Sequence, residues 1–280
     1  MNTDTNLVAG TPAPIGAGSL AAAYDAGHER VYATNRSDGS VSLIDIAGLA
    51  SFAAITVEER PDGIAYDPVR QRMFVANQSG DSVSVIDTNT RATTGSSISV
   101  GRLPRGVTYD SGNQRIYVAN NGHNTVSVID AVTRTVIGGA ISVGAGPTYL
   151  SYDSDGGRMY VSAAVDGSVS VINTATNTVV ATVPVGNSPL GIAYDSGNRR
   201  MYVANNLSNT VSVIETQTNQ VTATIAVGAG PFGIAYDSAH RRMYVSNSLA
   251  DSISVIDTAS NGIIATIPLE FTPRGIVIAP

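Results

Sequence analysis

The stretch that decides the fold is Gly191–Val227, GIAYDSGNRRMYVANNLSNTVSVIETQTNQVTATIAV. Apolar residues alternate with polar or small ones in four short runs, and β-branched types are frequent among them, which is typical of β-strands. The runs predict strands at Gly191–Tyr194, Met201–Asn205, Val211–Ile214 and Val221–Val227. The Asp, Ser, Gly and Asn residues between the runs favour turns. The stretch therefore predicts one unit of four short strands.

Most of the remaining chain consists of copies of this stretch. The tyrosine of its Tyr-Asp pair recurs at intervals of 42 or 43 residues, at Tyr24, Tyr66, Tyr109, Tyr152, Tyr194 and Tyr236. Four short strands repeated at this period are typical of β-propeller blades. The predicted fold class is all-β, a β-propeller with six complete four-stranded blades. A closed ring of blades makes one domain, so we predict a single domain over residues 1–280.

Both ends of the chain carry partial copies of the repeat. Residues 5–16 match its fourth strand, and Arg274–Ala279 match its first. We expect Leu7–Ile15 to pair with Gly275–Ala279, so that the two termini close the ring as a partial seventh blade and satisfy backbone groups that a lone strand leaves open. The alternative is a six-bladed ring, in which the N-terminal segment extends the outer edge of blade 6 beyond Ile263–Pro268.

Composition excludes several kinds of chemistry. The chain has no cysteine, hence no disulfide or thiolate metal site, and all sixteen basic residues are arginine, which excludes a Schiff-base lysine. The net charge of −6 argues against a nucleic-acid partner. No apolar run is long enough to insert in a membrane. The N-terminal residues lack the basic and apolar regions of a signal peptide.

The second and third strands carry a specific resemblance. The runs IYVANN, MYVANN and MYVSNS, followed by NTVSVID and by TNTVVATVPVGNSP, resemble the YVTN family of β-propeller repeats. The resemblance covers nearly the whole chain. It implies a secreted or cell-surface propeller of the kind found in archaeal surface layers and bacterial secreted proteins. It implies no catalytic residue, because propellers host enzymes, binders and scaffolds alike.

Two repeated features are predicted to be structural. Aromatic residues recur in the first and second strands, and their periodicity favours packing between blades over a stacking platform for sugars or bases. Each blade also has an aspartate followed five residues later by an arginine, as in Asp195 and Arg200. We expect these pairs to form salt bridges across the hairpin between strands one and two, where the aspartate can also cap turn amides.

Function is expected where the copies differ. The loop before strand one and the loop between strands two and three lie on the same face of a propeller, so variable residues there would surround the channel mouth. The tentative ligand-binding residues are Arg60, Asp62, Arg102, Arg105, Tyr149, Phe232 and Arg274. Tyr149 replaces the glycine found in most copies. Several arginines and a tyrosine could hold a carboxylate, a sulfate or a glycan.

No catalytic residue, metal site or cofactor is predicted. His28 and His240 lie in hairpin turns on the face opposite His123, so the three cannot share one metal, and they are expected to be solvated turn residues. Tryptophan and haem-attachment motifs are absent. We therefore expect a non-enzymatic binding or scaffold module, extracellular or at the cell surface, whose partner is a protein, a glycan or a small anion. The alternative is a channel-mouth hydrolase or lyase acting on a small anionic or sugar substrate.

Overall fold

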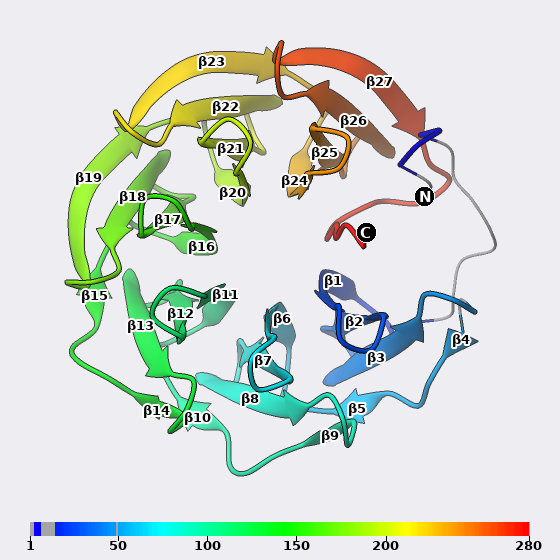
Figure 1. Ribbon diagram of the computed structural model, residues 1–280, viewed down its shortest axis with the longest axis vertical. Helices are drawn as coiled ribbons and strands as arrows, with labels where there is room; N and C mark the ends of the chain where they lie inside the picture. Colours follow the sequence, from blue (N-terminus) through cyan, green and yellow to red (C-terminus); the bar gives the residue numbers. More distant parts are fainter. Residues whose placement is uncertain (1–2, 7–14, 49, 280) are drawn as a thin grey trace. The chain divides into compact units, whose positions relative to one another are not determined.

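The structure, a computed structural model, describes residues 3–6, 15–48 and 50–279. The described residues are all-β and form six antiparallel sheets, each built from strands that follow one another along the chain (Figure 1). We call these sheets blades 1 to 6. The prediction of six four-stranded blades is confirmed. No helix among the described residues is long and apolar enough to cross a membrane.

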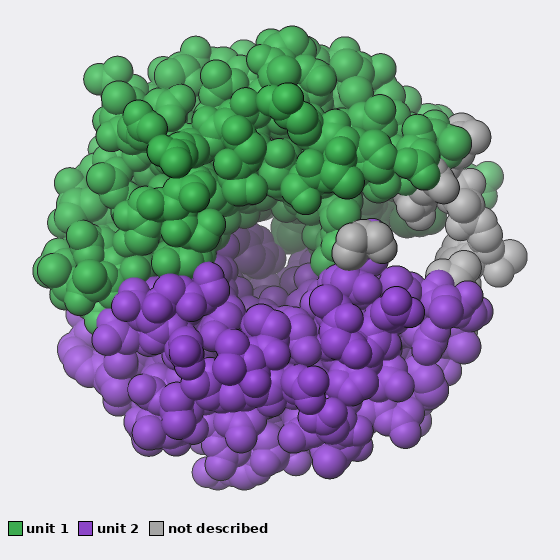
Figure 2. All heavy atoms as spheres, viewed as in Figure 1, with its two compact units in different colours: residues 1–12, 151–278, 280 green, residues 13–150, 279 purple. Residues whose placement is uncertain are grey.

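The chain divides into two compact units, which are coloured separately in Figure 2. Unit 1 comprises residues 1–12, 151–278 and 280, and unit 2 comprises residues 13–150 and 279. The chain passes from unit 2 to unit 1 within one strand, Pro147–Asp153. The single domain expected over residues 1–280 stays a prediction.

Unit 2 contains blades 1 to 3. Blade 1 has β1 (Ser19–Asp25), β2 (Arg30–Asn35), β3 (Ser40–Asp45), β4 (Ala50–Ser51) and β5 (Ile55–Thr56). Blade 2 has β6 (Pro61–Asp67), β7 (Arg72–Asn77), β8 (Ser82–Asp87), β9 (Ala92–Thr93) and β10 (Ile98–Ser99). Blade 3 has β11 (Pro104–Asp110), β12 (Arg115–Asn120), β13 (Thr125–Asp130), β14 (Thr135–Val136) and β15 (Ile141–Ser142).

Blades 4 to 6 have four full strands each. Blade 4 has β16 (Pro147–Asp153), β17 (Arg158–Ala163), β18 (Ser168–Asn173) and β19 (Thr178–Pro184). Blade 5 has β20 (Pro189–Asp195), β21 (Arg200–Asn205), β22 (Thr210–Glu215) and β23 (Gln220–Ala226). Blade 6 has β24 (Pro231–Asp237), β25 (Arg242–Asn247), β26 (Ser252–Asp257) and β27 (Gly262–Pro268).

The outer strand differs between the two halves of the chain. In blades 1 to 3 it is split into two strands of two residues, whereas β19, β23 and β27 are continuous over seven residues. Gly95 and Gly138 interrupt the outer strands of blades 2 and 3, with φ angles of 70° and 67°. A left-handed glycine breaks an extended strand, while the β-branched runs in β19 and β23 favour one.

Neighbouring blades bury the predicted aromatic residues between them. The second-strand aromatics are fully buried, at Tyr32, Phe74, Tyr117, Tyr160, Tyr202 and Tyr244. Glycine at the start of the first strand allows the next blade to come close. A Cβ on Gly63 would lie 2.4 Å from the carbonyl oxygen of Arg105, and one on Gly191 would lie 2.3 Å from that of Phe232. The prediction that these repeat positions serve packing is confirmed for the second-strand aromatics.

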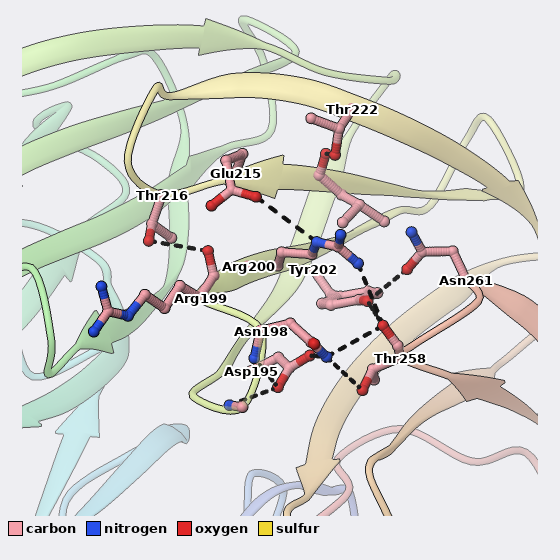
Figure 3. A network of polar contacts seen from close by, with 12 residues as sticks. Asp195, Asn198, Arg199, Arg200, Tyr202, Glu215, Thr216, Thr222, Thr258 and Asn261 are labelled. Atoms are coloured by element: carbon pink, nitrogen blue, oxygen red, sulfur yellow. Dashed lines mark hydrogen bonds and ion pairs between the residues drawn. The ribbon is translucent and has the colours of Figure 1, made fainter.

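The predicted salt bridge between Asp195 and Arg200 is wrong (Figure 3). The Asp195 carboxylate is buried and accepts hydrogen bonds from the amides of Gly197 and Asn198 and from the Asn198 side chain. Arg200 instead donates to the carbonyl oxygen of Thr258 in blade 6 and pairs with Glu215 at 3.8 Å. The Asp195 carboxylate is already engaged by the turn amides and by Asn198. The Arg200 side chain therefore forms a hydrogen bond between blade 5 and blade 6 instead of a salt bridge within its own hairpin.

This arrangement predicts that the aspartate matters more than the arginine. Asp195→Ala is expected to lower the free energy of unfolding by about 1–2 kcal/mol, because buried turn amides lose their acceptor. Arg200→Ala is expected to cost less than about 1 kcal/mol, since its pair with Glu215 is partly solvated. Urea unfolding of the two single variants and the double variant measures both. If the two single variants lose the same free energy of unfolding and the double variant loses no more than either, a salt bridge between Asp195 and Arg200 would be supported instead.

The ends of the chain contact blade 6 within unit 1. The carbonyl oxygen of Arg274 accepts a hydrogen bond from Ser246, as that of Leu190 does from Ser162 in the preceding blades. Residues 275–279 belong to no strand, and residues 7–14 lie outside the described part of the chain. The expected pairing of Leu7–Ile15 with Gly275–Ala279 therefore falls on undescribed residues. The six-bladed alternative matches the sheets that the structure describes.

Candidate anion-binding site

A buried carboxylate organises the candidate site in unit 2. The Asp62 side chain, near the start of β6, is 0% exposed. Its Oδ2 lies 3.3 Å from Nε of Arg105, and its Oδ1 accepts a hydrogen bond of 3.1 Å from the Tyr149 hydroxyl. The Arg105 guanidinium lies 5.8 Å from the centre of the Tyr149 ring, within cation–π distance. The three side chains therefore form one contiguous cluster.

The repeat brings these residues together. Strands β1, β6 and β11 are neighbours within unit 2, and each is the first strand of its blade (Figure 1). Asp62 and Arg105 occupy the same position in consecutive copies, 43 residues apart. The close approach at Gly63 holds the two strands near each other. Tyr149 stands where most other copies carry glycine, and its long side chain reaches back to Asp62.

Two further arginines lie beside this cluster. Arg36 follows β2, is half-buried and donates a hydrogen bond to the side-chain oxygen of Gln78. Its Nε is buried without a hydrogen-bond partner. Arg60 precedes β6 and is exposed. The two arginines, with neighbouring residues from blades 1 and 2, line a hollow of about 340 Å³ whose lining is Arg36, Ser37, Asp38, Gly39, Glu59 and Arg60.

Burial and neighbouring charges shift the pKa values of the site's side chains. Burial lowers the pKa of Arg36, and the charges of Arg60 and Arg105 act in the same direction, while Asp62 opposes them. Burial, the largest single cause, acts to lower the pKa of Arg105, but the charges of and hydrogen bonds with Asp62 and Tyr149 together outweigh it, and the pKa is raised. Burial and then the Asp62 charge raise the pKa of Tyr149, so its phenol stays neutral and donates. With Asp38 and Glu59 in the lining of the hollow and Asp62 in the cluster, three carboxylates stand against three guanidinium groups, and the formal charges balance at 3 − 3 = 0.

The structure gathers some of the expected residues and not others. Asp62, Arg105 and Tyr149 form the cluster, and Arg60 lines the adjoining hollow. Arg102 is exposed in the loop before β11, and its backbone makes hydrogen bonds with His123 and Gly122. Arg274 and Phe232 contact each other in unit 1, with the guanidinium 5.3 Å from the ring centre.

Sequence reasoning missed Arg36. It follows Asn35, the asparagine that ends the second strand of blade 1. The same position in the other copies holds Gln78, Asn121, Ala164, Asn206 and Ser248. Asn121 and Asn206 use this position to donate to the first carbonyl of the next blade's first strand, at Pro147 and Pro231. The sequence could have indicated Arg36, because this position differs between copies and directly follows the asparagine that ends most second strands. It lies in the loop between strands two and three, on the face expected to carry the channel mouth.

The histidines are not merely solvated. Nδ1 of His28 lies 2.8 Å from Asp25, and Nδ1 of His240 lies 2.8 Å from Asp237, so each supports the aspartate that caps its own turn. The ring of His123 accepts a hydrogen bond from the amide of Arg102. Among the described residues, no group of three or more His, Cys, Asp or Glu side chains has the arrangement of a metal site.

Comparison with known proteins supports the fold. A family model described as "Lactonase, 7-bladed beta-propeller" matches residues 135–225. Among solved structures, the chain is similar to Kuenenia stuttgartiensis hydrazine synthase, with a TM-score of 0.83 and 20% sequence identity over 98% of this chain and 92% of that one. A search of curated proteins finds no match. The blades and these similarities define the class of the protein, which is a β-propeller.

Proposed function

We propose that this chain is a β-propeller binding module that holds a small anion, such as a carboxylate, a sulfate or an acidic sugar, at the cluster around Asp62. The observation that carries the proposal is the gathering of Arg36 and Arg60 in one hollow beside Arg105, which is paired with the fully buried Asp62 carboxylate. The whole chain is acidic, with a net charge of −6, and Asp38 and Glu59 also line the hollow, so the proposal rests on the guanidinium groups as hydrogen-bond donors and not on net charge. The adjoining hollow of about 340 Å³ offers room for a small ligand.

Arg36 is the residue most in need of a counter-ion. Its side chain donates to the neutral amide of Gln78, and its neighbours Arg60 and Arg105 repel it. A guanidinium removed from water and left without a carboxylate carries a desolvation cost that a bound anion would offset. Arg105, in contrast, is already paired with Asp62. We therefore assign ligand contact to Arg36 and Arg60, and the positioning of the cluster to Asp62, Arg105 and Tyr149.

Calorimetric titration with acetate, succinate, sulfate and glucuronate at low ionic strength tests the proposal. Arg36→Ala combined with Arg60→Ala is expected to weaken binding of the preferred anion by about tenfold or more, which corresponds to about 1.4 kcal/mol. Arg102→Ala removes the same kind of charge from an exposed loop and is the matched control. Equal affinity in the double variant, the control and the unaltered protein would refute the site, and so would the absence of binding by all four anions.

A second candidate function is hydrolysis of a small anionic or sugar substrate. The match of residues 135–225 to a lactonase family model favours it, and this segment includes Tyr149. A lactone yields a carboxylate product, which the arginines could hold. Incubating the protein with a panel of lactones and following acid release separates the two candidates. Turnover that is lost in Asp62→Asn would establish a hydrolase, whereas anion binding without turnover supports the binding module.

The cellular setting is also part of the proposal. The resemblance of the repeats to the YVTN family supports a role outside the cell or at its surface, with a protein or glycan as the larger partner. In that setting the anion would be an acidic group on a glycan or protein surface. Competition between the free anion and a panel of immobilised acidic glycans would show whether the same arginines bind the free anion and the glycan.

A further inference from the structure

A second group of side chains holds the N-terminal residues on blade 6. Nε2 of His240 lies 2.8 Å from Oδ1 of Asp4, while Nδ1 lies 2.8 Å from Oδ2 of Asp237. Arg242 donates a hydrogen bond of 2.7 Å to the carbonyl oxygen of Thr3, and the Tyr244 hydroxyl donates to the side-chain oxygen of Asn6 at 2.9 Å. All of these residues belong to unit 1.

Residues 3–6 contact blade 6 at the position where, in blades 4 and 5, the turn after the third strand of the following blade makes contact. Between blades 4 and 5, Arg158 donates to the carbonyl of Thr216 and Tyr160 donates to Asn219. Between blades 5 and 6, Arg200 and Tyr202 contact Thr258 and Asn261 in the same way. Thr3 and Asn6 have the same spacing, and Asn6 has φ 55°, close to the 56° of Asn219. The N-terminal segment thus docks as the turn of a next blade would.

One part of this junction differs from its copies. Asp4 corresponds to Gln217 and Ala259, which are uncharged. His240 corresponds to Gly156 and Asn198 in blades 4 and 5. The contact between two ionisable groups is therefore specific to the N-terminal segment among these three junctions. The His240 side chain is 31% exposed and that of Asp4 is 73% exposed, so protons and water reach the contact.

We propose that the Arg242–Tyr244 face of blade 6 is a docking site for the chain's own segment 3–6, and that protonation of His240 stabilises the docked state. The imidazolium donates from Nδ1 to Asp237 and from Nε2 to Asp4, and so bridges the blade and the segment. A neutral ring donates from one nitrogen only. The other nitrogen then faces a carboxylate oxygen as a second acceptor, and the contact weakens.

The electrostatics give the direction of the change. The hydrogen bond from Asp237 raises the pKa of His240, burial opposes it, and the Asp237 and Asp4 charges add to the rise. Asp237 lies on the same turn as the ring and stays beside it when the segment leaves, so only the Asp4 contribution couples the pKa of His240 to docking. This contribution places the docked pKa above the undocked one, so docking is favoured at low pH and this stabilisation is lost as pH rises through the docked value. The charged groups facing the ring are Asp237 on its own turn and Asp4 on the segment, and Arg242 is engaged with Thr3.

The chain offers a direct probe of docking. Because it has no cysteine, Asn2→Cys creates a single attachment point for a nitroxide spin label. The mobile fraction of the label is expected to rise several-fold between pH 5.5 and pH 8.5. His240→Asn installs the residue that blade 5 uses at this position and can keep the bond to the aspartate, as Asn198 does with Asp195. In this variant the label should be mobile already at pH 5.5.

Two further variants make the test decisive. His28→Asn removes the equivalent histidine of blade 1, which pairs with Asp25, and should leave the pH response unchanged. Asp4→Asn should abolish the response while retaining the bond between His240 and Asp237. Any other ionisable group near the label is the same in every variant and is therefore controlled. A label that responds equally in His240→Asn and the unaltered chain, or that does not respond at all, overturns the proposal.

Discussion

Replacing Asp62 with asparagine is expected to lower the free energy of unfolding by about 2 kcal/mol while strengthening the binding of an anion several-fold. The carboxylate is fully buried between Arg105 and Tyr149, so its loss leaves a largely buried guanidinium without its counter-charge. The amide oxygen of asparagine still accepts from Tyr149, which keeps the cost below that of a complete break. The internal carboxylate no longer competes for the arginines, so a bound anion meets a larger positive field.

Urea unfolding measures the first effect and calorimetric titration the second. Glu59→Gln is the matched control, because Glu59 is exposed in the lining of the same hollow and its replacement changes the local charge by the same amount. This control should leave stability within about 0.5 kcal/mol of the unaltered protein. If Asp62→Asn binds the anion no better than Glu59→Gln does, the competition between Asp62 and the ligand is not part of the site.

Truncating a buried second-strand tyrosine should have the largest effect on stability. Tyr202→Ala is expected to cost about 3–5 kcal/mol, because the ring is fully buried between blades 5 and 6 and leaves a cavity. Tyr202→Phe should cost only about 1 kcal/mol, since it removes the hydroxyl that donates to Asn261 at 2.6 Å but keeps the ring. The chain already carries phenylalanine at this position in blade 2, where Phe74 is fully buried.

The comparison of the two Tyr202 variants separates packing from hydrogen bonding. Urea unfolding with a single-variant control at Leu207, whose side chain is 72% exposed, provides the measurement. Leu207→Ala should change the free energy of unfolding by less than about 0.5 kcal/mol. Similar losses in Tyr202→Ala and Tyr202→Phe would mean that the hydroxyl, and not the ring, holds the two blades together.

The site shows where sequence reasoning succeeded and where it did not. Asp62 and Arg105 were found because they occupy a position of the first strand that differs between the copies, and Tyr149 because it replaces the glycine of most copies. Arg36 was missed, since it lies after the second strand of the preceding blade and joins the cluster through a contact between blades. Arg102 was included by its nearness in sequence to Arg105, yet it extends from an exposed loop.

The amino-acid sequence by itself determined the blades. Alternation of apolar and polar residues sets the strands, turn residues set their ends, and the period of 42 or 43 residues sets the number of complete copies. Each of these is a local property of the chain, and each recurs six times. Tertiary structure alone decided the partners of the long charged side chains. Arg200 contacts Thr258 instead of Asp195, and His240 contacts Asp4. A long, flexible side chain can contact many groups, and which of them lie within its reach is set by folding, which brings together residues that are distant in sequence.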